Sequence, residues 1–122
     1  PYTTLFRSVN PVCKAGSSKF AISVNGDIYP CHTLIGKETF CMGNIYEKDV
    51  ILSDNFQKLR DKFYAYTCDR KKTNKCKNCF ARNVCITCFG QNYFTTGDIF
   101  KPDESDCNMK REMIKKILVK MV

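Results

Sequence analysis

The chain has 122 residues, enough for one small domain with a modest hydrophobic core, and it carries a formal net charge of +8. No apolar run approaches the roughly 18 residues of a membrane-spanning helix, so the sequence predicts no membrane segment. Nine cysteines are many for this length, and their odd number would leave one thiol over in a framework of disulfides alone. We therefore expect cross-links or cofactors to supply part of the stability.

The first eight residues, PYTTLFRS, look like the translation of a short adapter used in DNA sequencing. We expect residues 1–8 to be a non-native remnant and the domain to span residues 9–122. On this interpretation, native sequence that once preceded the domain is missing.

The segment KFAISVNGDIYPC, residues 19–31, predicts a β-hairpin. Every second residue from Phe20 to Val24 is a large apolar residue, which is the period of a strand. The pair Asn25-Gly26 is typical of a tight hairpin turn in which both central residues have positive φ. We expect this turn to bring Cys13 and Cys31 together, although 17 residues lie between them.

A short extended piece around Gly43 comes next, and a helix follows it. Asp54 and Gln57 resemble a capping box at the start of this helix. Apolar residues then recur at helical spacing from Phe56 to Tyr66, which predicts one buried helical face.

A basic stretch at residues 68–79 has no periodicity, and we expect a loop there. Gly90 and Gly97 predict turns further along. A last helix should begin after Pro102, because acidic residues followed by lysines suit the helix dipole. At 100° per residue its core-facing stripe would consist of Cys107, Ile114, Leu118 and Met121. Together these elements predict a small α+β fold.

Four cysteines lie within thirteen residues in CKNCFARNVCITC, residues 76–88. Disulfides among them would be strained, because the thiols are too close along the chain. One structural zinc ion could use the two C-x2-C pairs, although the spacer between such pairs is usually longer than five residues. Iron–sulfur clusters are the third explanation, since they bind cysteine thiolates in compact loops. The loop sequence alone does not decide among disulfides, a zinc ion and iron–sulfur clusters.

Seven cysteines and one glycine along the whole chain narrow the choice. Cys13 is followed by Gly26-x4-Cys31, then by C-x2-C-x5-C-x2-C at residues 76–88, and finally by Cys107. This pattern resembles the SPASM domain, the auxiliary-cluster domain at the C-terminal end of many radical S-adenosylmethionine enzymes. The last spacer within residues 76–88 has two residues where the family pattern has three. The segment CITCFGQNY is most similar to family members that mature peptides.

The resemblance implies two four-iron, four-sulfur clusters. The ligands of the first would be Cys13, Cys31 and Cys88, and those of the second would be Cys76, Cys79, Cys85 and Cys107. The family's extra upstream cysteine corresponds to Arg7, so the fourth ligand of the first cluster would either have been lost with the upstream sequence or be supplied by another residue.

Other candidate residues lie outside the family pattern. We expect Cys41 to be a small buried side chain, and Cys68 is a candidate substitute ligand. The single histidine, His32, is expected at the surface rather than on a metal. Arg82 and Asn83, inside the cysteine loop, would either solvate the loop or donate hydrogen bonds to cluster sulfurs.

The resemblance also implies a function. The domain would hold clusters that pass electrons or shape the binding site of a peptide or protein substrate, in the cytoplasm. Its partner in the same chain would be the enzyme core that binds S-adenosylmethionine and a third cluster. The C-x3-C-x2-C motif of that core does not occur, so we do not expect this chain to be catalytic alone. The alternative is a zinc-stabilised module whose basic face binds nucleic acid; a membrane partner is not expected.

Overall fold

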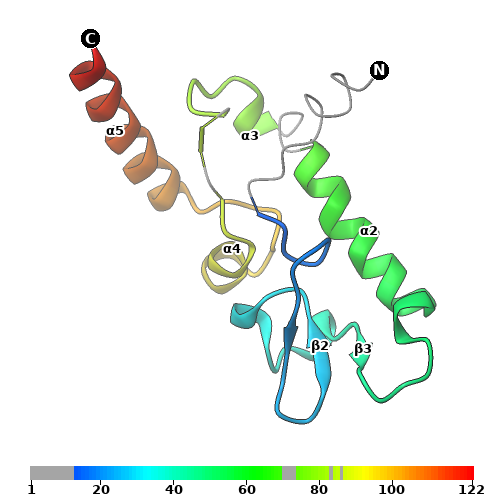
Figure 1. Cartoon of the computed structure of the whole chain (residues 1–122). Helices are drawn as coiled ribbons and strands as arrows, with labels where there is room; N and C mark the ends of the chain where they lie inside the picture. The colour runs from blue at the N-terminus through cyan, green and yellow to red at the C-terminus, as the bar shows by residue number, and fades with distance from the viewer. Residues whose placement is uncertain (1–12, 70–73, 83, 86) are drawn as a thin grey trace, which may run out of the picture. The chain divides into compact units, whose positions relative to one another are not determined.

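The computed structural model describes residues 13–69, 74–82, 84–85 and 87–122 (Figure 1). The expected adapter remnant, residues 1–8, lies outside these ranges. The chain forms two compact units, of which the first ends at Asp69 and the second begins at Arg70. The first unit contains a small sheet and one long helix, and the second contains helices and the cysteine loop, so the predicted α+β class is confirmed.

The sheet of the first unit is antiparallel and has three strands. These are β1 (Ala21–Ile22), β2 (Asp27–Tyr29) and β3 (Gly43–Asn44), in the spatial order β1-β2-β3. The predicted hairpin is confirmed, since Ala21 pairs with Tyr29. The extended piece at Gly43 is the third strand. Gly43 has a φ of 138°, and a Cβ there would lie 2.5 Å from Cγ2 of Val50, so the strand requires glycine.

The turn between β1 and β2 differs from the predicted one. The N–H of Gly26 donates to the Ser23 carbonyl oxygen (2.9 Å), and the N–H of Ser23 donates to the Asp27 carbonyl oxygen (2.9 Å). Only Gly26 of the predicted Asn25-Gly26 pair has a positive φ, at 88°. The loop therefore has three residues and ends in a left-handed glycine, which is the next most common hairpin geometry after the two-residue turns.

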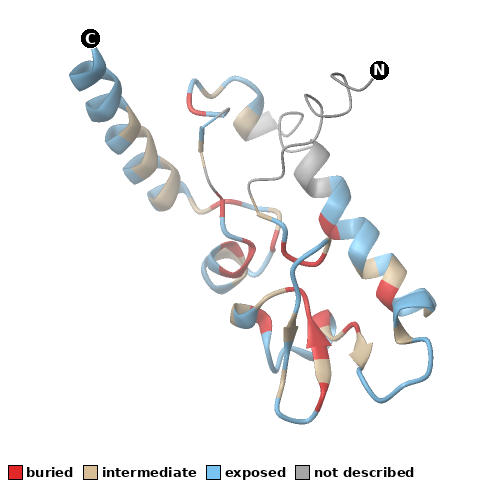
Figure 2. Ribbon diagram, viewed as in Figure 1, coloured by how far each residue is buried: buried red, intermediate tan, exposed pale blue. Residues whose placement is uncertain are grey.

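The core of the first unit lies between the sheet and α2 (Asp54–Asp69). Ile28 and Phe56 are buried in it with Met42, and Val50 and Leu59 pack around them (Figure 2). Burial of each large side chain contributes about 1.5–3 kcal/mol. The predicted apolar face of α2 is therefore confirmed, except at Tyr66, whose side chain lies outside the described residues. The connections contain three short 3₁₀ helices, η1 (His32–Leu34), η2 (Glu38–Phe40) and η3 (Val50–Leu52).

Phe63 on α2 is fully buried and fixes the segment that follows Cys13. Its ring meets Phe40 edge-on, with the centroids 6.3 Å apart. On another side it lies against Gly16, where an added Cβ would be 2.8 Å from the Phe63 ring carbon Cγ. Gly16 has a φ of 70°, so both its conformation and its contact with Phe63 require glycine.

The start of α2 is capped by Ser53 rather than by the predicted Asp54. The Ser53 hydroxyl accepts a hydrogen bond from the N–H of Phe56 (3.3 Å), and its carbonyl oxygen accepts one from the N–H of Gln57 (3.0 Å). The Gln57 side chain donates instead to the Ile51 carbonyl oxygen (2.6 Å). The capping-box prediction was wrong because Ser53 already satisfies the N–H group that Asp54 was expected to bind.

Replacing Ser53 with alanine should lower the free energy of unfolding of the first unit by about 1 kcal/mol, because the N–H of Phe56 loses its acceptor. Ser53→Gly should cost only a few tenths of a kcal/mol, since glycine leaves the N–H open to water. Hydrogen exchange of the α2 amides measures both changes. Equal losses in the two variants would show that the hydroxyl does not act as a cap.

The second unit contains α3 (Asn74–Lys77), α4 (Phe89–Thr96) and α5 (Glu104–Met121). The loop predicted at residues 68–79 was wrong at its start, where α2 continues to Asp69, and also where α3 forms. Gly90 is buried inside α4, so the turn predicted there was also wrong. Gly97 ends α4 with a φ of 77°, as a turn residue should. Asp103 caps α5 by accepting a hydrogen bond from the N–H of Asp106 (3.3 Å), which confirms the predicted start.

The apolar stripe of α5 does not lie in a core, contrary to the prediction. No residue of α5 is buried (Figure 2), and Leu118 and Met121 are 50% and 77% exposed. The stripe lines an open groove of about 460 Å³, to which the cysteine loop contributes only Val84 and Cys85.

No helix within the described ranges is both long enough and apolar enough to cross a bilayer.

Candidate metal centre

The cysteine loop folds through successive turns that place its thiols close together. The N–H of Cys79 donates to the Cys76 carbonyl oxygen (3.1 Å), and that of Cys85 donates to the Ala81 carbonyl oxygen (2.8 Å). Arg82 spans the loop by donating from Nη1 to the carbonyl oxygen of Lys77 (2.6 Å). Ala81 is buried, whereas most loop side chains between the cysteines are exposed. Backbone turns therefore hold the described part of the loop more than side-chain packing does.

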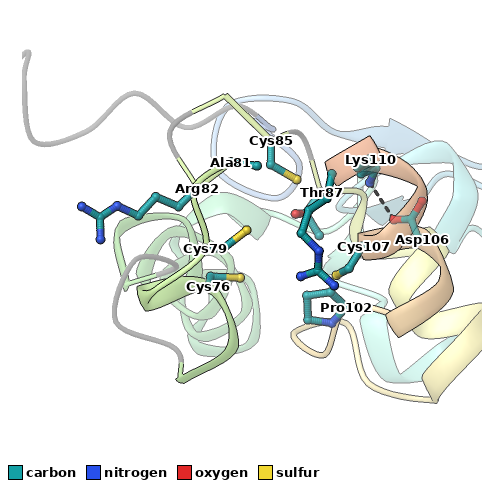
Figure 3. Close-up of a pocket in the computed structure, with 11 residues that line it drawn as sticks. Cys76, Cys79, Ala81, Arg82, Cys85, Thr87, Pro102, Asp106, Cys107 and Lys110 are labelled. Carbon is teal, nitrogen blue, oxygen red and sulfur yellow. Dashed lines mark hydrogen bonds and ion pairs between the residues drawn. The ribbon is translucent and has the colours of Figure 1, made fainter. Parts of the chain in front are cut away.

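Four cysteines border one pocket within the second unit (Figure 3). Three come from the cysteine loop and the fourth comes from the first turn of α5; they are Cys76, Cys79, Cys85 and Cys107. Figure 3 shows the sulfurs of Cys76 and Cys79 on the side of their loop that faces Cys107. This is the position that the predicted ligand set requires, although ligation itself stays a prediction.

The pocket that the four cysteines border is small. Its volume is about 30 Å³, which by this measure is room for about two or three water-sized spheres. Thr87, Pro102 and Arg111 also border it. Among the described residues, no three His, Cys, Asp or Glu side chains gather closely enough for a single metal ion. The four thiols therefore surround a small pocket of the second unit.

The donor set and the charge of the pocket fit an iron–sulfur cluster. Four thiols are the usual ligands of a four-iron cluster, which with four thiolates carries a charge of about −2. Arg82, Lys110 and Arg111 border the pocket, against the single carboxylate of Asp106. Lys110 forms an ion pair with Asp106 (2.6 Å, Figure 3), and the side chain of Arg82 points away from the pocket, so the remaining positive charge beside the thiols is that of Arg111.

Arg111 is anchored on α5 and contacts the cysteine loop. Its Nη2 donates to Oε1 of Glu104 (2.9 Å) and to Oδ1 of Asn108 (2.6 Å). The hydrogen bond to Glu104, and next a hydrogen bond to Cys79, raise the pKa of Arg111 above its ordinary value. The sequence prediction missed this residue, although it stands one helical turn after Cys107 and therefore shares its face of the helix.

Two predicted ligands in the first unit, Cys13 and Cys31, lie on neighbouring segments. The N–H of Gly16, three residues after Cys13, donates to the carbonyl oxygen of Pro30, which precedes Cys31 (3.0 Å). The Sγ of Cys31 shares a hydrogen bond with Oγ1 of Thr33 (2.8 Å). The backbone hydrogen bond between Gly16 and Pro30 shows that the segments carrying Cys13 and Cys31 lie close together, as the hairpin prediction requires. Whether the two thiols share a metal stays a prediction.

Cys88 belongs to the second unit, where its exposed side chain precedes α4. Its expected place beside Cys13 and Cys31 remains a prediction. Cys68 lies on the backbone of α2, but its side chain lies outside the described residues, as does Asn83.

Cys41 and His32 take no part in the pocket. Cys41 is half-buried rather than fully buried, and its thiol donates to the carbonyl oxygen of Gly43 (3.7 Å). Burial raises the pKa of the neighbouring Tyr29, and the charge of Cys41 adds to this increase. The side chain of His32 is exposed at the start of η1, as expected.

Comparison with known families adds independent support for a metal centre. A family model described as SPASM, an iron–sulfur cluster-binding domain, matches residues 13–80, which is more than half of the chain. The matched range contains Cys13, Cys31, Cys76 and Cys79, and the other predicted ligands follow it. A search of curated proteins finds no match.

Proposed function

Because the chain belongs to the SPASM family of iron–sulfur cluster-binding domains, we propose that the four pocket cysteines bind one four-iron, four-sulfur cluster. The observation that carries this proposal is that all four thiols border one pocket, although Cys107 stands 19 positions beyond Cys88 in the sequence. The bound cluster would supply one-electron chemistry. The residues around it would bind iron, offset its charge and limit its contact with water.

The second part of the proposal concerns the other cysteine group. Cys13, Cys31 and Cys88 would bind the first of the two clusters that family resemblance implies. Support within the first unit comes from the hydrogen bond between Gly16 and Pro30, which joins the segments that carry Cys13 and Cys31.

The biological setting follows from the family and is also a proposal. The domain would serve a radical S-adenosylmethionine enzyme of the cytoplasm that modifies a peptide or protein. Its clusters would pass electrons to the reacting site or help to form the substrate-binding surface. The catalytic core would lie elsewhere in the same enzyme.

Anaerobic purification and metal analysis test the proposal. The protein should be brown, absorb near 400 nm and contain about four iron atoms and four sulfides per complete cluster. Colourless protein with one zinc per chain would overturn the cluster assignment and favour the zinc-stabilised alternative. Cys76→Ala should lose iron, whereas Cys41→Ala, which alters a thiol outside the pocket, should keep it.

A further inference from the structure

The guanidinium of Arg111 is the pocket cation best placed to act on a bound cluster. Lys110 is neutralised by Asp106 at 2.6 Å, within a pair that is largely screened from solvent. Nη1 of Arg82 donates a hydrogen bond to the carbonyl oxygen of Lys77. Figure 3 shows the side chain of Arg82 directed away from the pocket. Arg111 borders the pocket with a side chain that is only 28% exposed.

The anchoring of Arg111 leaves donors available for sulfur. An arginine has five N–H donors in a fixed planar arrangement. The described bonds to Glu104 and Asn108 both use Nη2, which carries two of them. These bonds hold the plane of the guanidinium on α5, at the pocket that Cys79 also borders. Glu104 is 63% exposed, so water screens its opposing charge.

We propose that Arg111, held in place by Glu104 and Asn108, raises the reduction potential of the cluster bound in this pocket. This inference rests on the proposed function. When dithionite donates one electron, the net charge of a cluster with four thiolates changes from about −2 to about −3. A nearby cation and N–H donors to sulfur stabilise the more negative state, which raises the potential.

The test compares reduction potentials in the full chain. The cluster is titrated with dithionite, and its reduction is monitored by the electron paramagnetic resonance signal that is absent in Cys107→Ala. In Arg111→Gln, the ratio of reduced to oxidised cluster at a fixed solution potential should fall about tenfold, equivalent to about 59 mV. Arg111→Lys should shift less, because lysine keeps the charge but loses the planar donors.

Lys116→Gln is the matched control. It removes the same charge from the same helix at an exposed position that does not border the pocket. Its potential should equal that of the wild type. Equal potentials for wild type, Arg111→Gln and Lys116→Gln would overturn the role of Arg111.

Two further outcomes are distinct. If Arg111→Gln binds no iron, the reduction potential of Arg111→Lys is compared with that of the wild type instead. A wild-type potential in Arg111→Lys, together with full iron content in Arg111→Met, would overturn the inference. If the wild type itself binds no iron, both the proposed function and this inference are wrong. If the wild type binds a cluster and the reduction potentials of the variants are not shifted, only the inference about Arg111 is wrong.

Discussion

Replacing Cys107 with alanine should remove or destabilise the cluster in this pocket, with a loss of up to about four iron atoms per chain, and should loosen α5 from the cysteine loop. The three loop thiols would remain, but a cubane with three protein ligands has one iron open to water and exchange. The helix itself should still form, because alanine is the best helix former. Iron and sulfide analysis measures the first effect, and hydrogen exchange of the amides of residues 104–121 measures the second.

Cys41→Ala is the control for this experiment, since it removes a half-buried thiol that does not border the pocket. It should leave iron content and exchange in α5 unchanged. Wild-type iron content in Cys107→Ala would contradict the ligand assignment. Faster exchange along α5 in both variants would show that the loss is not specific to the pocket.

Phe63→Ala should destabilise the first unit by about 3–5 kcal/mol. The cost is large because the ring is fully buried and touches both Phe40 and the backbone of Gly16, so its removal leaves a cavity. Such a loss is a large share of the 5–15 kcal/mol that stabilises a typical domain. Hydrogen exchange at the N–H of Met42, which is bonded to the Ile28 carbonyl oxygen, reports the change.

The neighbouring Tyr64 provides the comparison, because its ring is 46% exposed. Tyr64→Ala should cost less than about 1 kcal/mol, as surface substitutions do. If both variants lost equal stability, the burial of Phe63 would not explain its contribution. Phe63→Leu should fall between wild type and Phe63→Ala, since it keeps part of the buried volume.

Local signals in the sequence predicted the hairpin and the start of α5. Gly26 indicates the hairpin turn whatever the length of the loop. Asp103 directly precedes the first residue of α5 and caps that helix. The third strand was recognised only as an extended piece, because the pairing of Gly43 with Ile28 joins residues far apart in the sequence. Gly90 was misinterpreted because a glycine inside a helix looks the same in a sequence as one in a turn.

The candidate site was predicted in part, for similar reasons. Cysteine spacing and family resemblance identified the four thiols that border the pocket. Periodicity placed Cys107 on the apolar face of α5, but it could not tell that the rest of this face would line an open groove. Arg111 was missed because charged residues on a helix are usually solvated, and only the pocket distinguishes it from Lys116.

The small number of buried side chains in the cysteine loop has a consequence for the degradation of the protein in a cell. Phe80 and Val84 are exposed there, and the described loop buries only small side chains such as Ala81 and Thr87. Beyond its backbone turns, the loop would gain further order from a bound cluster, since metal binding free energy is then folding free energy. Iron shortage or oxygen damage should therefore open the loop to proteases before the sheet unfolds, so that protein abundance would follow the supply of iron.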